Sequence, residues 1–377
     1  MAAGECGHIG SSLAYPYYRC PSQKPIPVQE WLVAQSEIQN VKLLDTYACD
    51  LSVIVVSFNT RDLLRECLAS LLEECGRLPE GVSAEVLVVD NGSSDGSAGM
   101  VESEFSSCPT QVRLLRSTVN LGFAAANNLA FVEARGKYLV MLNSDAFLHP
   151  GALGRALQLM ESSPDTGVGG AKLVGRDGAW QASGRRFPSL WRDALVLTGL
   201  SYHFPRSRIF GAPDRTWANP EEPAEVDWVP GAFSILRREA LAKTGSFDPA
   251  FFLYYEEVDL YRRIKAAGYR VQYWPQIVVT HLVGESGRQL QSAGTVSRVE
   301  LWRMRSALLY YRKHHGWQAW LARWLEQSIY HLRWLRNCRS KDPVRRKYAE
   351  QSAQLARLMR QAWKETDGGR VSPPRPW

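Results

Sequence analysis

Two adjacent glutamates follow a strongly aromatic stretch in the second half of the chain. The sequence FDPAFFLYYEEVDLYRR places Glu256, Glu257 and Asp259 within four residues. Crowded like charges beside apolar surface raise the pKa of a carboxyl group, which makes such a group a candidate general base. Alternatively, these acids occupy the first turn of a helix over 258–267, where the helix dipole favours negative charge. Asp259 fits this second role, or an ion pair with a nearby arginine.

Polar side chains also gather where apolar strands are expected to end. They are Ser57 and Asn59, then Asp90 and Asn91, then Asn143, Ser144 and Asp145. Asp90 and Asn91 could bond a base or ribose, or serve only as turn formers. Asp145 could ligate Mg²⁺ or Mn²⁺ with diphosphate oxygens, or cap the next helix. With His281, which follows a later strand, it would form a site suited to Mn²⁺, although a lone histidine is more often structural.

A third group lies in NLGFAAANN, where Asn120 and Gly122 precede a helix that carries Asn127 and Asn128 in its first turns. Two amides early in a helix lower its propensity, so ligand contact, capping or surface exposure must explain them. No GxGxxG loop follows the first strand, and no GxxxxGK[ST] loop exists. A bound nucleotide must therefore be held by carboxylates and a metal rather than by a glycine-rich phosphate loop.

These residues need a scaffold that brings strand ends together. The hydrophobic pattern predicts strands at 51–58, 84–89, 112–115, 138–142 and 270–279, and helices at 62–74, 94–105, 123–134, from Pro150, and at 258–267. Strand and helix alternate at roughly 30-residue spacing, which predicts a doubly wound, mostly parallel α/β sheet flanked by helices. Ligands of such sheets bind beyond the carboxyl ends of the strands, where the polar groups fall.

Composition places the chain among ordinary globular proteins. Its 377 residues are 45% hydrophobic and 22% charged, and its 7 cysteines form no Cys-x-x-Cys pair, which favours a reducing compartment. We divide the chain into an N-terminal extension (1–49), with one short helix near 28–40, a catalytic α/β domain (50–300) and a helical C-terminal region (301–377). No apolar run reaches the ~20 residues of a membrane-spanning helix, and no secretory signal is visible.

The C-terminal region is basic and rich in tryptophan. Residues 301–377 hold 17 Lys+Arg against 5 Asp+Glu, a charge of +12, while the rest carries 28 against 33, a charge of −5. They also hold 7 of the 13 tryptophans. A helix expected over 316–339 mixes tryptophan, leucine and arginine, as an interfacial helix does, with anionic lipid as its partner. The alternatives are packing of the tryptophans on the catalytic domain and, ranked last, nucleic-acid binding.

In order, these motifs resemble the family-2 glycosyltransferases of GT-A fold, and within them the rhamnosyltransferase-like branch. The resemblance runs from about Leu51 to Gly287. Its pieces are SVIVVSFN, VVDNGSSDGS, NLGFAAANN, LNSD, VDWVPGAFSILRRE, GSFDPAFFLYYEEVDLYRR and HLVGESG. Each piece alone is weak, but seven in the right order are specific.

The resemblance implies a role for each matching position. Ser57, Asn59 and Asp90, with Asn91 beside them, would hold the base and ribose of a nucleotide diphospho-sugar. Asn120, Gly122 and Asn127 would lie near the ribose and diphosphate, and Trp228, Gly231 and Ala232 would line the sugar pocket. Asn143, Ser144 and Asp145 match the Asp-x-Asp motif, so that Asp145 and His281 would ligate Mg²⁺ or Mn²⁺. Glu257 would be the catalytic base, with Glu256 as the alternative.

Two positions depart from the family pattern. Asn143 replaces the first acid of the metal motif, and Glu257 replaces the usual aspartate at the base position. The resemblance implies an inverting, metal-dependent transfer of a sugar, such as rhamnose, to a glycan or lipid-linked acceptor in cell-envelope polysaccharide synthesis. We expect a cytoplasmic protein, peripheral on the inner membrane face. The alternatives are another sugar-nucleotide transferase on the same sheet, or an inactive sugar-nucleotide-binding scaffold.

Overall fold

The computed structural model describes residues 47–108, 110–282 and 296–373. Contacts within the chain define two units, Met1–Glu37 and Ile38–Trp377, and every described residue belongs to the second. The helix expected near 28–40 lies outside the described residues, as does most of the predicted N-terminal extension.

The described strands are β1 (Cys49–Ser57), β2 (Ala84–Asn91), β3 (Gln111–Ser117), β4 (Gly136–Asn143), β5 (Ala146–Leu148), β6 (Thr166–Val174), β7 (Trp180–Gln181), β8 (Ala224–Glu225), β9 (Phe233–Arg237) and β10 (Arg270–His281). The described helices are α2 (Arg61–Gly76), α3 (Ser97–Phe105), α4 (Phe123–Glu133), α5 (Ala152–Ser162), α6 (Leu190–Thr198), α7 (Leu200–His203), α8 (Arg238–Thr244), α9 (Glu256–Ala266), α11 (Val296–His315), α12 (Gln318–Asn337) and α13 (Pro343–Glu365).

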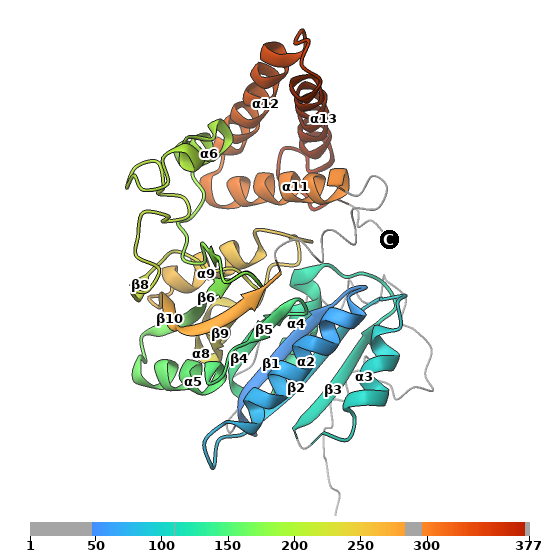
Figure 1. Cartoon of the computed structure of the whole chain (residues 1–377), viewed down its shortest axis with the longest axis vertical. Coiled ribbons are helices and arrows are strands. Elements are labelled where there is room, and N and C mark those ends of the chain that lie inside the picture. The colour runs from blue at the N-terminus through green and yellow to red at the C-terminus, as the bar shows by residue number, and fades with distance from the viewer. Residues whose placement is uncertain (1–46, 109, 283–295, 374–377) are drawn as a thin grey trace, which may run out of the picture. The chain divides into compact units, whose positions relative to one another are not determined.

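One mixed sheet organises the strands, in the order β3-β2-β1-β4-β9-β6-β10-β5 (Figure 1). Strands β3, β2, β1 and β4 are parallel neighbours, and β6 and β10 are parallel to each other. Strand β9 runs antiparallel between β4 and β6, and β5 runs antiparallel to β10 at the edge. Pairing of Ser57 with Asp90, and of Val56 with Asn143, brings the carboxyl ends of β1, β2 and β4 level. The expected mostly parallel α/β sheet is confirmed.

Helices cover both faces of this sheet. Helices α2, α3 and α5 pack with the sheet in one large apolar core, which includes the β-branched Val53, Val55 and Val86. Helix α4 packs against β1 and β2, α8 against β4, and α9 against β6 and β10. The β-branched runs form strands because their side chains pack well on a pleated, buried surface.

Strand β6 is glycine-rich because large side chains lie directly on its backbone. A Cβ added at Gly169 would meet the Trp274 indole at 1.9 Å, and one at Gly170 would meet Val229 at 2.5 Å. Since any side chain there would displace these neighbours, the glycines serve close packing. Close packing therefore accounts for the string Gly167-Val168-Gly169-Gly170, and no bound phosphate is needed to explain its glycines.

Of the C-terminal helices, α11 packs against the α/β domain, whereas α12 exposes several large apolar side chains. Helix α11 buries Tyr310 and Tyr311 against Phe251 and Val258, next to α9. Its Trp302 ring lies 4.3 Å, centroid to centroid, from that of Phe252. Within residues 47–108, 110–282 and 296–373, no helix is long and apolar enough to cross a membrane.

Helix α12 has two different faces. Ala319, Glu326 and Tyr330 are its buried residues. Trp317, Trp320 and Trp324, together with Leu332 and Leu335, are exposed. We call these five residues the α12 tryptophan stripe. Their spacing puts them on the side opposite the buried residues, because a helix turns once every 3.6 residues.

Candidate active site

Three hydroxyl groups form a chain of hydrogen bonds at the aligned ends of β1 and β4. Oγ of Ser57 lies 2.9 Å from Oγ1 of Thr60, which lies 2.9 Å from Oγ of Ser144. All three residues are buried. The hydroxyls therefore tie the β1 end to the β4 end, and Thr60 is a connection that the sequence analysis missed.

Asn59 and Asp90 hold the turn that follows β2. Asn59 has a φ of 53°, a conformation that asparagine tolerates better than most residues, and its Oδ1 accepts from the Ser94 N–H at 2.8 Å. Burial raises the pKa of Asp90, and hydrogen bonds from Ser93 offset part of that rise. Oδ1 of Asp90 is buried without a hydrogen-bond partner among the described residues. A donor on a ligand, such as a ribose hydroxyl, would satisfy it.

Asn91 and Asn120 bind each other and the loop before α4. Oδ1 of Asn91 accepts from the Leu121 N–H at 2.8 Å, and its Nδ2 donates to Oδ1 of Asn120 at 3.1 Å. The next residue of the loop, Gly122, has a φ of 81°, and an added Cβ would lie 2.3 Å from the carbonyl oxygen of Phe252. These contacts hold the loop against the segment that leads into α9. The predicted substrate roles stay predictions.

Both early amides of α4 are buried. Nδ2 of Asn127 donates to the Phe123 carbonyl at 2.9 Å. Asn128 donates to the Phe247 carbonyl at 2.8 Å and accepts from the Phe247 N–H at 3.0 Å. Asn128 is therefore explained by tertiary contact, an explanation that the sequence analysis did not consider. Surface exposure explains neither amide, and Asn127 stays a predicted ligand-binding residue.

Asp145 and His281, 136 positions apart in sequence, meet at the sheet edge. Oδ1 of Asp145 lies 3.5 Å from Nε2 of His281. The pairing of β5 with β10 places them there, since His281 is in register with Ala146. The backbone of Asn143, two residues before Asp145, is held by a hydrogen bond from its N–H to the Ala232 carbonyl at 3.1 Å.

Gln181 holds the imidazole of His281 in place. Its Nε2 donates to the His281 carbonyl at 2.8 Å, and its Oε1 lies 3.3 Å from Nδ1. With Nδ1–H donating to Oε1, Nε2 keeps its lone pair and faces Asp145, as a metal-ligating histidine does. The two side chains thus fit a divalent cation whose remaining ligands are diphosphate oxygens and water. Among the described residues, no group of three or more His, Cys, Asp and Glu side chains could hold a metal ion.

Glu256 and Glu257 begin α9, after Tyr254 and Tyr255, which both have a φ of 67°. This left-handed pair costs free energy and turns the chain sharply into the helix. Burial raises the pKa of Glu256 well above its usual value, and the charge of Glu257 raises it further. Burial also raises the pKa of Glu257, but backbone N–H groups and Arg185 offset part of that rise. The charge of Arg185 thus favours the ionised form of Glu257, whereas the charge of Glu257 opposes ionisation of Glu256.

The surroundings of Glu257 include the predicted sugar pocket. The backbone N–H of Gly231 lowers the pKa of Glu257, while Oε2 of Glu257 is buried without a hydrogen-bond partner among the described residues. Trp228 donates from Nε1 to the Arg186 carbonyl at 2.9 Å, and the Arg185 guanidinium lies 5.0 Å from its ring centroid. Ala232 is buried. The Glu257 carboxylate thus has an oxygen without a partner among the described residues, which is available for a proton.

Asp259, also on α9, has the structural role expected of it. Its Oδ2 accepts from Nε of Arg263 at 2.9 Å, and its Oδ1 lies 2.7 Å from Nε2 of His314 and 2.8 Å from Nζ of Lys313. Burial would raise the pKa of Asp259, but His314, Arg263 and Lys313 lower it to about 2. We call these four residues the Asp259 cluster. It fastens α9 to the end of α11.

Sequence reasoning missed Thr60, Gln181, Arg185 and Arg192. Gln181 lies on a two-residue strand, β7, Arg185 lies in the irregular stretch before α6, and Arg192 lies in the first turn of α6. Thr60 comes two residues after the apolar run 51–58, but a hydroxyl at such a point is also an ordinary helix-capping residue, and the other three residues follow no apolar run.

Comparisons with known proteins agree with this geometry. A family model described as glycosyl transferase family 2 matches residues 52–245. The curated N-acetylglucosaminyl-diphospho-decaprenol L-rhamnosyltransferase of Mycobacterium tuberculosis is 28% identical over 295 residues, which cover 75% of this chain and 91% of the relative.

Two solved structures share the fold. The mannosyltransferase PcManGT of Pyrobaculum calidifontis, in complex with GDP-Man and Mn²⁺, has a TM-score of 0.52 at 19% identity, covering 90% of this chain and 95% of that one. The structure of GalNAc-T7 with UDP, GalNAc and Mn²⁺ has a TM-score of 0.50 at 14% identity, covering 92% and 67%. At these identities the likeness shows the fold alone.

Proposed function

The chain belongs to glycosyl transferase family 2 and is a glycosyltransferase, and from this premise we propose an inverting, metal-dependent transfer from a nucleotide diphospho-sugar to an acceptor hydroxyl. The observation that carries the proposal is the environment of the Glu257 carboxylate. Its pKa is raised by burial, and its Oε2 is buried without a hydrogen-bond partner among the described residues. A general base needs a pKa near the working pH and an oxygen open to its substrate.

The mechanism is a single displacement. Glu257 takes the proton of the acceptor hydroxyl as its oxygen attacks the anomeric carbon, and the bond from that carbon to the diphosphate breaks. Attack opposite the leaving group inverts the configuration. A divalent cation held by Asp145 and His281 would neutralise charge on the departing diphosphate. Asp90, with its unpartnered Oδ1, would bond the nucleoside, beside Ser57 and the loop containing Asn120 and Gly122.

We further propose a role in cell-envelope polysaccharide synthesis, with a glycan or lipid-linked acceptor. This rests on the Mycobacterium tuberculosis relative, which is named as an L-rhamnosyltransferase acting on N-acetylglucosaminyl-diphospho-decaprenol. Rhamnose is accordingly the first donor sugar to test.

A panel of nucleotide sugars, including a rhamnosyl donor, tests the activity. With Mn²⁺ or Mg²⁺, we expect one donor to release nucleoside diphosphate well above the rate without protein, and chelator to stop the release. Nucleoside diphosphate release is the measurement. Donor binding without release from any sugar, with or without an added acceptor, would contradict the enzymatic proposal and favour a sugar-nucleotide-binding scaffold.

The α12 tryptophan stripe supports a peripheral membrane role. Trp317, Trp320 and Trp324 are 67%, 50% and 58% exposed. Indole rings anchor at the membrane interface, and each nearby basic residue adds roughly 1 kcal/mol of attraction to an anionic leaflet. The charge of +12 on residues 301–377 would supply that attraction. We therefore propose that the stripe contacts an anionic membrane surface.

Replacing Trp317, Trp320 and Trp324 together by alanine should reduce binding to anionic vesicles at least tenfold. The helix should persist, because alanine favours helix and the buried Ala319 and Tyr330 are untouched. Flotation with phosphatidylglycerol vesicles at low salt measures the effect, and Val344→Ser, an exposed apolar position on α13, is the matched control. Equal binding by the triple variant and the parent would refute the membrane role of the stripe.

A further inference from the structure

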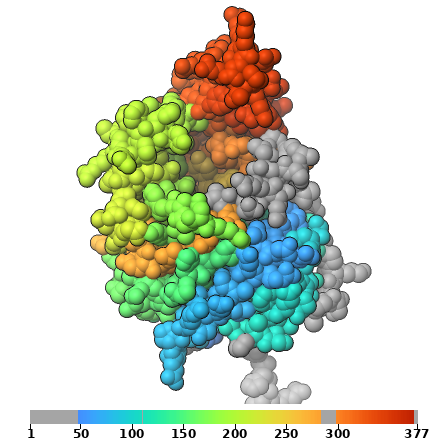
Figure 2. Space-filling view, in the orientation of Figure 1, coloured from blue at the N-terminus to red at the C-terminus, as the bar shows by residue number. Residues whose placement is uncertain are grey.

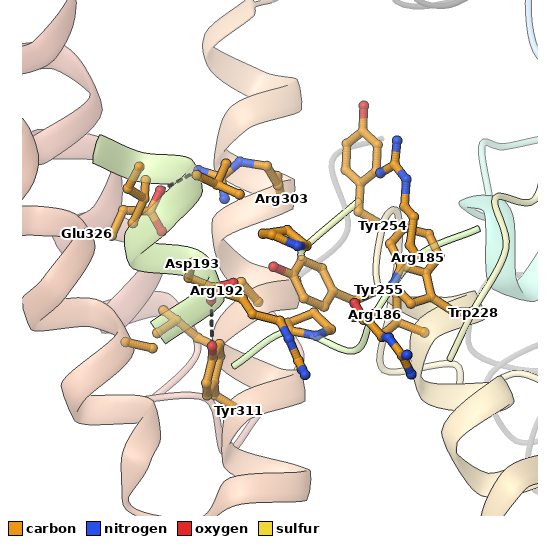
Figure 3. Close-up of a pocket in the computed structure, with 18 of the residues that line it drawn as sticks. Arg185, Arg186, Arg192, Asp193, Trp228, Tyr254, Tyr255, Arg303, Tyr311 and Glu326 are labelled. Atoms are coloured by element: carbon orange, nitrogen blue, oxygen red, sulfur yellow. Dashed lines mark hydrogen bonds and ion pairs between the residues drawn. The ribbon is translucent and has the colours of Figure 1, made fainter. Parts of the chain in front are cut away.

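A cavity of about 340 Å³ extends from the catalytic glutamate to the C-terminal helices. Its lining comes from three parts of the chain: the stretch around α6, the region of Trp228 and Tyr254 to Val258, and helices α11, α12 and α13. Figure 2 shows the surface hollowed between the segment around α6, in yellow-green, and the C-terminal helices. In Figure 3, Arg185, Trp228 and Tyr254 lie on one side and the Arg303–Glu326 pair on the other.

Glu257 lines this cavity. Its unpartnered Oε2 marks where an acceptor hydroxyl must arrive if Glu257 is the base. The molecule that carries the hydroxyl therefore occupies the cavity, and the chemistry of the other walls indicates what that molecule is.

Three arginines of the same short stretch provide positive charge. Arg185 and Arg186 make ion pairs with Asp214 at 3.3 Å and Asp227 at 3.4 Å, with half-exposed guanidinium groups. Arg192 has no ion pair among the described residues. Nη1 of Arg192 donates to the Phe187 carbonyl at 2.7 Å, and its Nε is buried without a partner. A buried N–H of a guanidinium calls for an acceptor, and phosphate oxygens match its geometry.

The other charges of the cavity are already compensated. Arg303 pairs with Glu326. Asp193 accepts from the Tyr311 hydroxyl at 2.5 Å, and burial raises the pKa of Asp193 to about 6. Arg192 also contributes to lowering the pKa of Asp193, but it forms no ion pair among the described residues, so its guanidinium can still bind an anion.

The remaining wall is apolar. It is formed by Val196, Leu197, Ala307, Leu308, Ala322 and Met359. Hydrocarbon gains free energy on such a surface, whereas a sugar or phosphate there would lose hydrogen bonds to water. The cavity thus offers a base for a hydroxyl, a guanidinium for an anion, and a surface for an apolar chain.

We propose that this cavity is the acceptor site, and that the acceptor is amphiphilic, with its sugar joined to a hydrocarbon chain through phosphate or diphosphate. Arg192 binds the phosphate, assisted by Arg185 and Arg186. The proposal rests on the proposed function, because Glu257 defines the sugar end of the cavity.

Binding of decyl diphosphate to the full-length protein, measured by calorimetry below the micelle concentration, tests the site. Chelator keeps diphosphate out of the metal-dependent donor site, and inorganic diphosphate and decyl glucoside are the comparison ligands. We expect decyl diphosphate to bind at least tenfold more tightly than either. Equal affinity for inorganic diphosphate would show that the apolar wall contributes nothing, and equal affinity for decyl glucoside that the arginines contribute nothing. Either result overturns the proposal.

Arg192→Gln should weaken binding of decyl diphosphate at least tenfold and leave that of decyl glucoside within twofold. Arg345→Gln, at an exposed position on α13, is the matched control and should change neither. If Arg192→Gln folds, judged by its melting temperature, and binds decyl diphosphate like the parent, the site is wrong even if sugar transfer is demonstrated. Conversely, Arg192→Gln could weaken binding of decyl diphosphate while the parent protein hydrolyses no nucleotide sugar. That result would overturn the proposed function and the acceptor role, and the cavity would then be only a binding site for amphiphiles.

Discussion

Glu257→Gln is expected to lower sugar transfer by about 10²- to 10⁴-fold, the usual contribution of a general base, while donor affinity stays within a few-fold. The amide keeps the shape of the side chain, but it cannot take the proton of the acceptor hydroxyl. Transfer and nucleoside diphosphate binding, measured on the same protein, check the two halves of this expectation.

The pH dependence should follow from the raised pKa of Glu257. The base must be ionised, so kcat/KM should rise with pH through that pKa, at higher pH than for an ordinary glutamate. Glu257→Gln should lose this rising limb. A variant that keeps near-normal turnover with the same pH profile would exclude Glu257 as the base.

Glu256→Gln is the matched control. Burial and the neighbouring charge raise the pKa of Glu256 well above the usual value, which favours its protonated form. A carboxyl whose folded-state pKa is raised stabilises the fold at low pH and loses that contribution as pH rises through the folded-state pKa. Glu256→Gln should therefore retain transfer and unfold at a higher temperature than the parent at alkaline pH. Loss of transfer in Glu256→Gln but not in Glu257→Gln would move the base by one residue.

Asp145→Ala is expected to lower metal-dependent donor affinity by at least about 100-fold, since it removes one of two protein ligands. Gln181→Ala should have a smaller effect, about 10- to 100-fold, because it only releases the His281 imidazole. Titration of nucleoside diphosphate with and without Mn²⁺ separates the metal-dependent part. Asp62→Ala, an exposed carboxylate on α2, should leave both titrations unchanged. Full transfer in excess chelator would refute the metal role.

The parallel half of the sheet could be predicted because its strands are buried on both faces. Such strands appear in the sequence as continuous β-branched runs, as in residues 51–58. Strands β6, β9 and β5 were not predicted. Strand β6 is glycine-rich because it accommodates Trp274 and Val229, which come from distant parts of the chain. Strand β9 lies antiparallel to both of its neighbours, β4 and β6, and this direction depends on which strands are available to pair with it rather than on its own residues.

The same limit applies to the candidate site. Asp145 and His281 could be expected to meet because each follows a strand of one sheet. The roles of Asn91 and Asn128 could not be assigned, since an amide that bonds a loop and one that bonds a ligand look identical in sequence. Arg185 and Arg186 precede α6 in an irregular stretch and Arg192 lies on that short helix, so only the folded chain reveals that they line the cavity of Glu257.

The Asp259 cluster also limits how this chain can be recombined with its relatives. Arg263, Lys313 and the His314 imidazole converge on one buried carboxylate, three positions after Glu256 on the same helix. A chimera joined between β10 and α11 would combine α9 of one parent with α11 of another, and it would leave Asp259 facing side chains that did not evolve with it. Exchange of acceptor preference by transplanting the C-terminal helices should therefore succeed only when α9 is transplanted with them.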